Sequence, residues 1–180
     1  MKLTTAVFLF AAVLSAQDQS ANPLIGTSKA VFGISKTDIL GSVDKIPEAL
    51  WSYQPTEDVR TVAQLFAHIA DGQYEFCGLA VEGNPVSKGI EKTAKTKGEI
   101  VAALKEAFAY CDAAYANLVD AKAAETVQFH GMTVTRLGAM DFNTAHNMEH
   151  YGNLVTYMRL KNIVPPSSTP RTPPAGATGK

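Results

Sequence analysis

The chain has 180 residues, enough for one domain with a hydrophobic core that needs no disulfide or metal to fold. Its composition is ordinary for a globular protein, with 46% hydrophobic residues, 18% charged residues and a formal net charge of −1. Because 16 Lys and Arg residues are offset by 17 Asp and Glu residues and form no basic run, the sequence gives no indication of a nucleic-acid-binding surface.

The N-terminus has the pattern of an export signal. A short basic start (residues 1–2) precedes an apolar-rich stretch (3–14), and small residues follow near a cleavage point (15–17). The apolar stretch is too short to span a bilayer, which takes about 18 residues or more, and no other stretch approaches that length. We predict a signal peptide at residues 1–17 and a periplasmic or extracellular protein. An uncleaved N-terminal anchor and a buried helix of similar composition are the alternatives.

Export would place Cys77 and Cys111 in a compartment that permits a disulfide. The pattern puts Cys77 near the end of one helix and Cys111 well inside the next, and we take these two helices to be antiparallel. The two Cα atoms would then lie at different heights, farther apart than the ~5–6 Å of a usual disulfide. We therefore expect two buried free thiols.

Apolar residues recur at spacings of three and four in four long segments, which predicts four amphipathic helices. Thr61 is a good N-cap for the second of them. The expected helices lie at residues 28–45, 61–82, 98–122 and 135–162.

The segments between these helices have loop and hairpin patterns. We expect coil at residues 17–27, a long loop at 83–97, and a small β-hairpin in which two β-prone runs flank His130 and Gly131. Five of the nine prolines fall in residues 165–180, which predicts a flexible tail. The expected fold is all-α, a four-helix bundle over residues 18–164 with a long connection between its second and third helices.

Two histidines four residues apart, His146 and His150, fall on the last predicted helix. Residues at this spacing lie on one helix face with Cβ atoms roughly 5–6 Å apart, so both imidazoles can reach one ion. They share the inward half of the helix with Phe142 and Tyr157. His68, at the border of the core face of the second helix, can supply a third ligand from across the bundle.

Three neutral imidazoles suit zinc, nickel, iron or copper, and a catalytic site of this kind leaves one position open to water or substrate. The alternative is that the three histidines are purely structural, because an isolated pair at this spacing is common by chance. Among other polar residues, we expect Asp71 and Glu75 to form a solvated helix flank rather than to assist His68, and His130 to be an exposed turn residue.

The ordered set of motifs resembles the DinB-like superfamily. Residues 60–70, in which a capping Thr precedes an apolar run ending in His68, look like that family's second-helix motif. Residues 143–166, with two histidines four apart and a Pro-Pro exit, are similar to its last helix, and residues 46–50 also fit. The resemblance extends over about residues 28–166.

The resemblance implies an up-down-down-up bundle, often dimeric, in which His68, His146 and His150 hold a divalent metal ion, zinc or nickel in our prediction. Relatives include metal-dependent S-transferases that use low-molecular-weight thiols and a thiol-dependent isomerase. Those enzymes are cytosolic, so the export signal leaves a thiol cosubstrate in question.

We therefore predict an exported metal-binding protein, a homodimer that acts as a metal-dependent hydrolase or transferase on a small molecule. The sequence indicates no general base, and neither cysteine has a basic neighbour that would make it a nucleophile. The alternative is a non-catalytic bundle that binds a metal or a small ligand.

Overall fold

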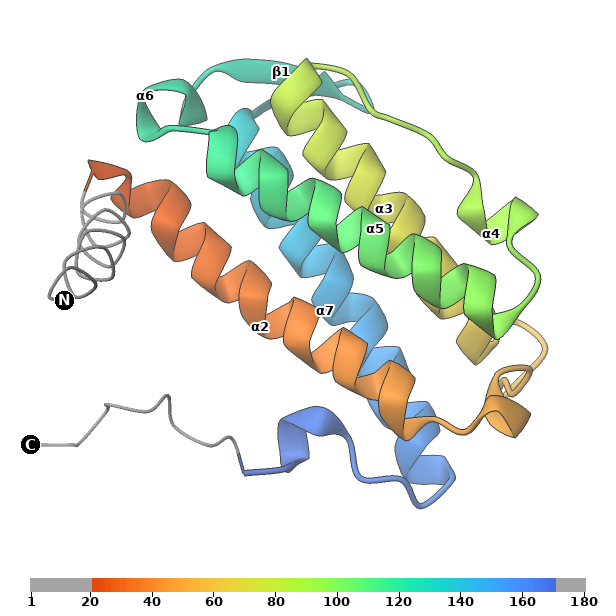
Figure 1. The fold of residues 1–180 in the computed structure, drawn as a ribbon. Helices are drawn as coiled ribbons and strands as arrows, with labels where there is room; N and C mark the ends of the chain where they lie inside the picture. Colours follow the sequence, from red (N-terminus) through yellow and green to blue (C-terminus); the bar gives the residue numbers. More distant parts are fainter. Residues whose placement is uncertain (1–20, 171–180) are drawn as a thin grey trace, which may run out of the picture.

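The computed structural model describes residues 21–170, which form a helical bundle with one small hairpin (Figure 1). The predicted signal peptide and the last ten residues of the predicted tail lie outside the described residues. Within that range, none of the helices combines the length and the hydropathy that a membrane span needs. The four long helices are α2 (Pro23–Lys45), α3 (Val62–Glu82), α5 (Lys97–Asn117) and α7 (Arg136–Leu160).

The bundle has the predicted up-down-down-up order. Helix α3 packs against α5 and α7, and α2 packs against α7 and α5. Lys36 of α2 pairs with Asp112 of α5, while Ser28, earlier in α2, contacts Tyr115, later in α5, so these two helices are antiparallel. The Cys77–Cys111 bond joins the C-terminal thirds of α3 and α5, which are therefore parallel.

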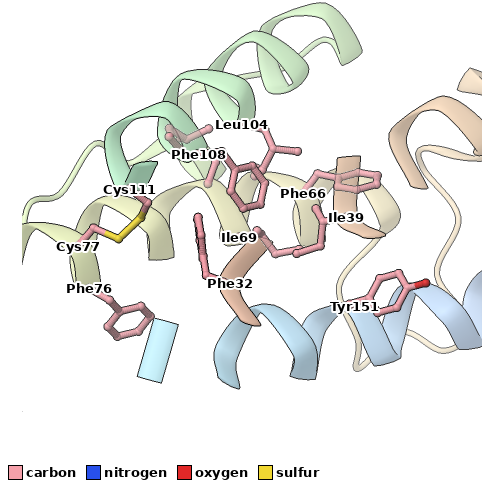
Figure 2. Packing of buried hydrophobic residues seen from close by; sticks show 14 of the residues in the cluster. Phe32, Ile39, Phe66, Ile69, Phe76, Cys77, Leu104, Phe108, Cys111 and Tyr151 are labelled. Atoms are coloured by element: carbon pink, nitrogen blue, oxygen red, sulfur yellow. A yellow bond between two sulfur atoms is a disulfide. The ribbon is translucent and has the colours of Figure 1, made fainter. Parts of the chain in front are cut away.

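The two cysteines form a disulfide with a Cα–Cα distance of 5.4 Å, so our expectation of free thiols was wrong (Figure 2). The error came from taking the second and third long helices as antiparallel. The connection between them returns the chain to the start of α3 before α5 begins, and both cysteines consequently lie at the same height in the bundle.

Helix α2 begins at Pro23, about one turn before the predicted start at residue 28. The carboxylate of Asp120 accepts hydrogen bonds from the backbone N–H groups of Leu24 and Ile25, at 2.9 and 3.0 Å. Asp120 opens the short helix α6 (Asp120–Ala123), far away in sequence. The first turn of α2 is therefore capped by a residue that no local pattern around residue 23 contains.

The predicted hairpin is present as β1 (Thr126–Phe129) and β2 (Met132–Thr135), paired antiparallel with Phe129 opposite Met132. His130 and Gly131 occupy its two-residue turn with φ values of 45° and 81°. Both angles are positive, as a tight hairpin turn requires, and glycine takes such an angle without strain. The hairpin leads directly into α7.

The first part of the predicted flexible tail is packed on the bundle. Pro165 is buried, and a short 3-10 helix, η2 (Pro166–Ser168), lies against α2. The Tyr151 hydroxyl donates to the Ser167 hydroxyl at 2.7 Å and accepts from the Ser167 backbone N–H at 3.0 Å. Order therefore extends past the predicted domain end at residue 164.

The core is made by the inward faces of all four long helices. Rings from different helices contact one another, as where Phe32 of α2 lies 5.9 Å from Phe108 of α5, and aliphatic side chains fill the space between them (Figure 2). At one end Trp51, just after the 3-10 helix η1 (Glu48–Leu50), stacks on Phe66 with ring centroids 5.1 Å apart. Helices α3 and α7 pack directly against each other, which positions the polar residues between them.

Candidate metal centre

The structure brings together the three predicted histidines, one from α3 and two from α7. The Nε2 atom of His146 lies 3.1 Å from Nε2 of His68 and 3.1 Å from Nε2 of His150. Each of the three side chains offers one ring nitrogen, and these three nitrogens lie within 4.8 Å of one another. His150 is buried, whereas His68 and His146 are partly exposed, so the cluster lies near the surface with its interior side closed.

Helix capping and a buried polar network set the rotation of the two helices that carry the histidines. Thr61 and Gln64 form a reciprocal capping box that fixes the first turn of α3. In the core, Gln73 of α3 donates to the Asn147 side chain at 2.6 Å, and Asn143 donates to Gln73 at 2.8 Å. Because Asn143 and Asn147 flank His146 on α7, these bonds hold the histidine face of α7 toward α3.

The environment keeps two of the imidazoles neutral. Burial, together with repulsion from the neighbouring His150 and His68, lowers the pKa of His146 to about 3. Burial and repulsion from His68 likewise lower the pKa of His150 to about 4. Both residues therefore have an uncharged ring near neutral pH, which is the form that binds a metal ion.

A carboxylate that the sequence analysis missed orients the third imidazole. Glu91 lies 3.2 Å from Nδ1 of His68 and accepts a hydrogen bond when that nitrogen carries the proton, which leaves the lone pair of Nε2 directed toward the other histidines. The other carboxylate oxygen of Glu91 accepts a hydrogen bond from Nε of Arg60 at 2.9 Å. Glu91 belongs to α4 (Ile90–Thr93), a short helix within the segment that we predicted to be a loop.

Asp71 holds that short helix in place. Its two carboxylate oxygens accept hydrogen bonds from the backbone N–H groups of Ile90 and Glu91, at 2.8 and 2.9 Å. Asp71 is thus not simply a solvated residue on the flank of α3, as we had expected. It caps α4 and thereby sets the position of the Glu91 carboxylate beside His68.

The other polar candidates lie outside the cluster. His130 is at the exposed hairpin turn, as predicted, and its Nε2 lies 3.3 Å from Oε1 of Glu75. Tyr157 is buried and donates a hydrogen bond to the backbone carbonyl of Arg60. No proximity in sequence could have revealed Glu91, because it lies in a polar stretch 23 residues from His68.

The donor set fits a divalent transition metal. The Nε2 atom of His146 faces the Nε2 atoms of both His68 and His150, and among the described residues the buried Nδ1 atoms of His146 and His150 have no hydrogen-bond partner. Histidine nitrogens bind such ions at about 2.0–2.1 Å, so one ion can reach nitrogens that are 3.1 Å apart. Pairwise hydrogen bonds among three neutral rings cannot satisfy all of these nitrogens.

The fold and the site define an up-down-down-up four-helix bundle with a three-histidine cluster between its second and last long helices. The family model described as the DinB superfamily matches residues 34–154. The chain belongs to the DinB superfamily, as its motifs had indicated.

Solved structures of other proteins have the same fold. A DinB-like protein from Bacillus subtilis is 20% identical with a TM-score of 0.66, and the match covers 84% of this chain and all of that one. A DinB-like protein from Bacillus cereus is 13% identical with a TM-score of 0.62, covering 73% and 89%. A mycothiol-dependent maleylpyruvate isomerase is 15% identical with a TM-score of 0.60, covering 72% of this chain and 60% of that one. No curated protein matches the chain.

Proposed function

We propose that this protein is an exported metal-dependent enzyme, a hydrolase or a transferase, whose metal ion is held by His68, His146 and His150. The observation that carries the proposal is the convergence of three Nε2 atoms, with the far side of the His68 ring held by a carboxylate. Zinc and nickel suit three neutral imidazoles. Three protein ligands leave a coordination position for water or a substrate.

A divalent ion held by these three histidines would supply Lewis acidity, which would stabilise developing negative charge and lower the pKa of a bound water molecule or thiol. The residues of the chain hold the ion and orient its ligands. His146 and His150 contribute neutral rings, and Glu91 fixes the direction of the His68 ring. The packing of α3 against α7 excludes water from the inner side of the cluster.

A non-catalytic metal-binding bundle is the second candidate, and one observation favours it. Within residues 21–170, the carboxylate in contact with the cluster is that of Glu91, and it already bonds Arg60 and His68. It is therefore poorly placed to take a proton from a nucleophile.

The lack of a base does not count against a transferase. A thiol that loses its proton on binding the metal needs no such base, and the fold neighbour that depends on mycothiol has this kind of cosubstrate.

Export is supported by the disulfide between Cys77 and Cys111, because such bonds persist in oxidising compartments and are rare in the cytosol. Mass spectrometry of the protein recovered from the periplasm or the medium tests this part of the proposal. We expect a mature N-terminus within a residue or two of position 17. A full-length chain confined to the cytosol would contradict it.

Metal analysis tests the centre itself. Protein purified without a nickel-affinity tag should contain about one zinc or nickel ion per chain, and His150→Ala should lose it. Metal-free wild-type protein that cannot be loaded would rule out both candidates. A screen of esters, amides and thiol-acceptor pairs on the metal-loaded protein then separates the two candidates. Turnover that His150→Ala abolishes identifies an enzyme. No turnover identifies a metal-binding protein.

A further inference from the structure

Three phenylalanine rings from different elements form a cluster beside the histidines. Phe76 of α3 contacts the His146 ring edge-on, with centroids 5.2 Å apart. Phe142 of α7 lies 5.1 Å from Phe76 and 5.2 Å from Phe129 of β1, again by ring centroids. The His146 ring is therefore in contact with a cluster of aromatic rings.

One ring of this cluster is left open to solvent. Phe76 and Phe129 are buried, but Phe142 is 46% exposed. Phe142 precedes His146 by four residues, so both side chains lie on the same face of α7. Aromatic rings beside a site with few, well-placed polar groups are the usual lining for an apolar part of a ligand. The exposed ring of Phe142 is thus positioned as a contact for a ligand bound at the histidines.

A cation, Arg60, lies on the side of the three histidines away from the phenylalanine rings. Arg60 precedes α3, and its Nε shares the Glu91 carboxylate with His68. The Arg60 side chain is 41% exposed, and the structure gives its other guanidinium nitrogens no hydrogen-bond acceptor among the described residues. A guanidinium has five N–H donors in a planar fork that matches a carboxylate.

The order of these groups along the two helices is Arg60, then the histidines, then the phenylalanines. On α3, Phe76 follows His68 by eight residues, about 12 Å along the axis. On antiparallel α7, Phe142 likewise lies beyond His146 on the side away from Arg60. A ligand with its charged group between the ion and Arg60 would therefore extend its apolar part toward Phe142.

We infer that the site takes a small carboxylate that carries an aromatic or similarly flat apolar group. The carboxylate lies between the metal ion and the Arg60 guanidinium, and the ring packs on Phe142. This inference rests on the proposed function, because it requires the ion at the three histidines.

Binding to cobalt-loaded protein tests the inference without depending on activity, since ligands that enter the coordination sphere change the visible spectrum of cobalt. The probes are benzoate, acetate and benzyl alcohol. We expect benzoate to bind about fivefold more tightly than acetate, because a ring contact adds about 1 kcal/mol. Benzyl alcohol, which lacks the charge, should bind more weakly than benzoate.

Two variants separate the contributions of ring and charge. Phe142→Ala should remove most of the preference for benzoate over acetate and leave acetate binding unchanged. Met148→Ala is the matched control, because Met148 is a similarly exposed apolar residue of α7, 43% exposed, that lies toward α2. Arg60→Gln should weaken benzoate and acetate by the same factor of several-fold, and Arg60→Lys should restore part of the loss.

Metal content is measured on every sample, so the two levels of failure can be told apart. Wild-type protein that holds no metal overturns the proposed function and this inference with it. Protein that holds metal but binds benzoate no better than acetate overturns only the inference. So does a preference for benzoate that persists in Phe142→Ala, or a loss of that preference in Met148→Ala.

Discussion

Gly72 lies where α3 faces the ring of His146, one turn after His68. A Cβ atom at this position would lie 2.6 Å from Cε1 and 2.9 Å from Nδ1 of His146, closer than real Cβ atoms approach other atoms. The ring is packed against Phe76 and cannot move away freely. Gly72 therefore creates the space in which His146 reaches the other two histidines.

Replacing Gly72 with Ala should consequently displace the His146 ring and weaken metal binding by about tenfold or more. The measurement is a competition titration of zinc against a chromophoric chelator. Gly33→Ala is the control, because a Cβ atom at residue 33 of α2 meets nothing within 4 Å. Equal zinc affinity in Gly72→Ala and the wild type would show that the ring is not held in this way.

The lowered pKa values of His146 and His150 predict how the metal-free protein responds to acid. In the unfolded chain both rings take up protons near pH 6.5, whereas in the folded protein they do so only near pH 3 and pH 4. Between about pH 6.5 and pH 4 the unfolded state therefore binds more protons, and the free energy of unfolding falls as the pH falls.

Urea denaturation of metal-free protein at several pH values between 7.5 and 4.5 measures this dependence. The double variant His146→Gln/His150→Gln has no such groups and should lose less stability over the same window. An identical slope in the variant and the wild type would contradict the prediction. Other titrating groups are common to both proteins, so the difference isolates the two histidines.

The cluster of three histidines was predictable from the sequence, and the groups that orient its rings were not. His146 and His150 share a face because of their spacing, and His68 follows from the border of an amphipathic pattern. Glu91 lies in a polar segment without periodicity, and its contact with His68 depends on Asp71 folding that segment into α4. Such a contact exists only once the tertiary structure has formed.

Helix α4 is the element that links the core of the bundle to the candidate metal centre. It has four residues, too few for a stable helix alone, so its position depends on the bonds from Asp71 to its first backbone N–H groups. The side-chain amide of an asparagine has one oxygen, so it could not accept both backbone hydrogen bonds in the way that the two carboxylate oxygens of Asp71 do.

We therefore expect Asp71→Asn to loosen α4 and release Glu91 from His68, which should lower zinc affinity by about tenfold while the global fold persists. The chelator competition gives the affinity, and circular dichroism checks helix content. Glu75→Gln is the control, since Glu75 lies one turn farther along α3 and contacts only His130 among the contacts described for its carboxylate. A loss of affinity in both variants would indicate a general charge effect instead.

The bounds of the elements were predicted best where local signals decide them. Thr61 and Thr135 cap α3 and α7 close to where the pattern placed the helix starts. The start of α2 was missed, because its cap comes from Asp120 in α6. The ordered η2 segment was missed as well, since its composition is that of a tail and its order comes from packing on α2 and from the hydroxyl of Tyr151.

At the scale of the whole molecule, the parallel arrangement of α3 and α5 decides the cysteine pairing. Residues 77 and 111 lie in the C-terminal thirds of α3 and α5, so parallel helices bring them together. The sequence pattern placed each cysteine on its helix. It did not indicate that the connection between α3 and α5 leads the chain back to the end of the bundle where α3 begins. The bond lies next to the buried network of Asn143 and Gln73 that sets the rotation of α7.

Reduction of the disulfide should accordingly lower the stability of the whole bundle and not only of one helix pair. The bond closes a loop with a sequence separation of 34, for which the chain-entropy estimate is about 3–4 kcal/mol. We expect a reducing agent to lower the midpoint of urea unfolding of the wild type, while Cys77→Ala/Cys111→Ala should have a low midpoint that the reducing agent does not change. A wild-type midpoint that is insensitive to complete reduction, verified by thiol titration, would show that packing alone holds α3 and α5. Because a loss of this size approaches the total stability of many domains, the protein should reach its full stability only where the disulfide can form.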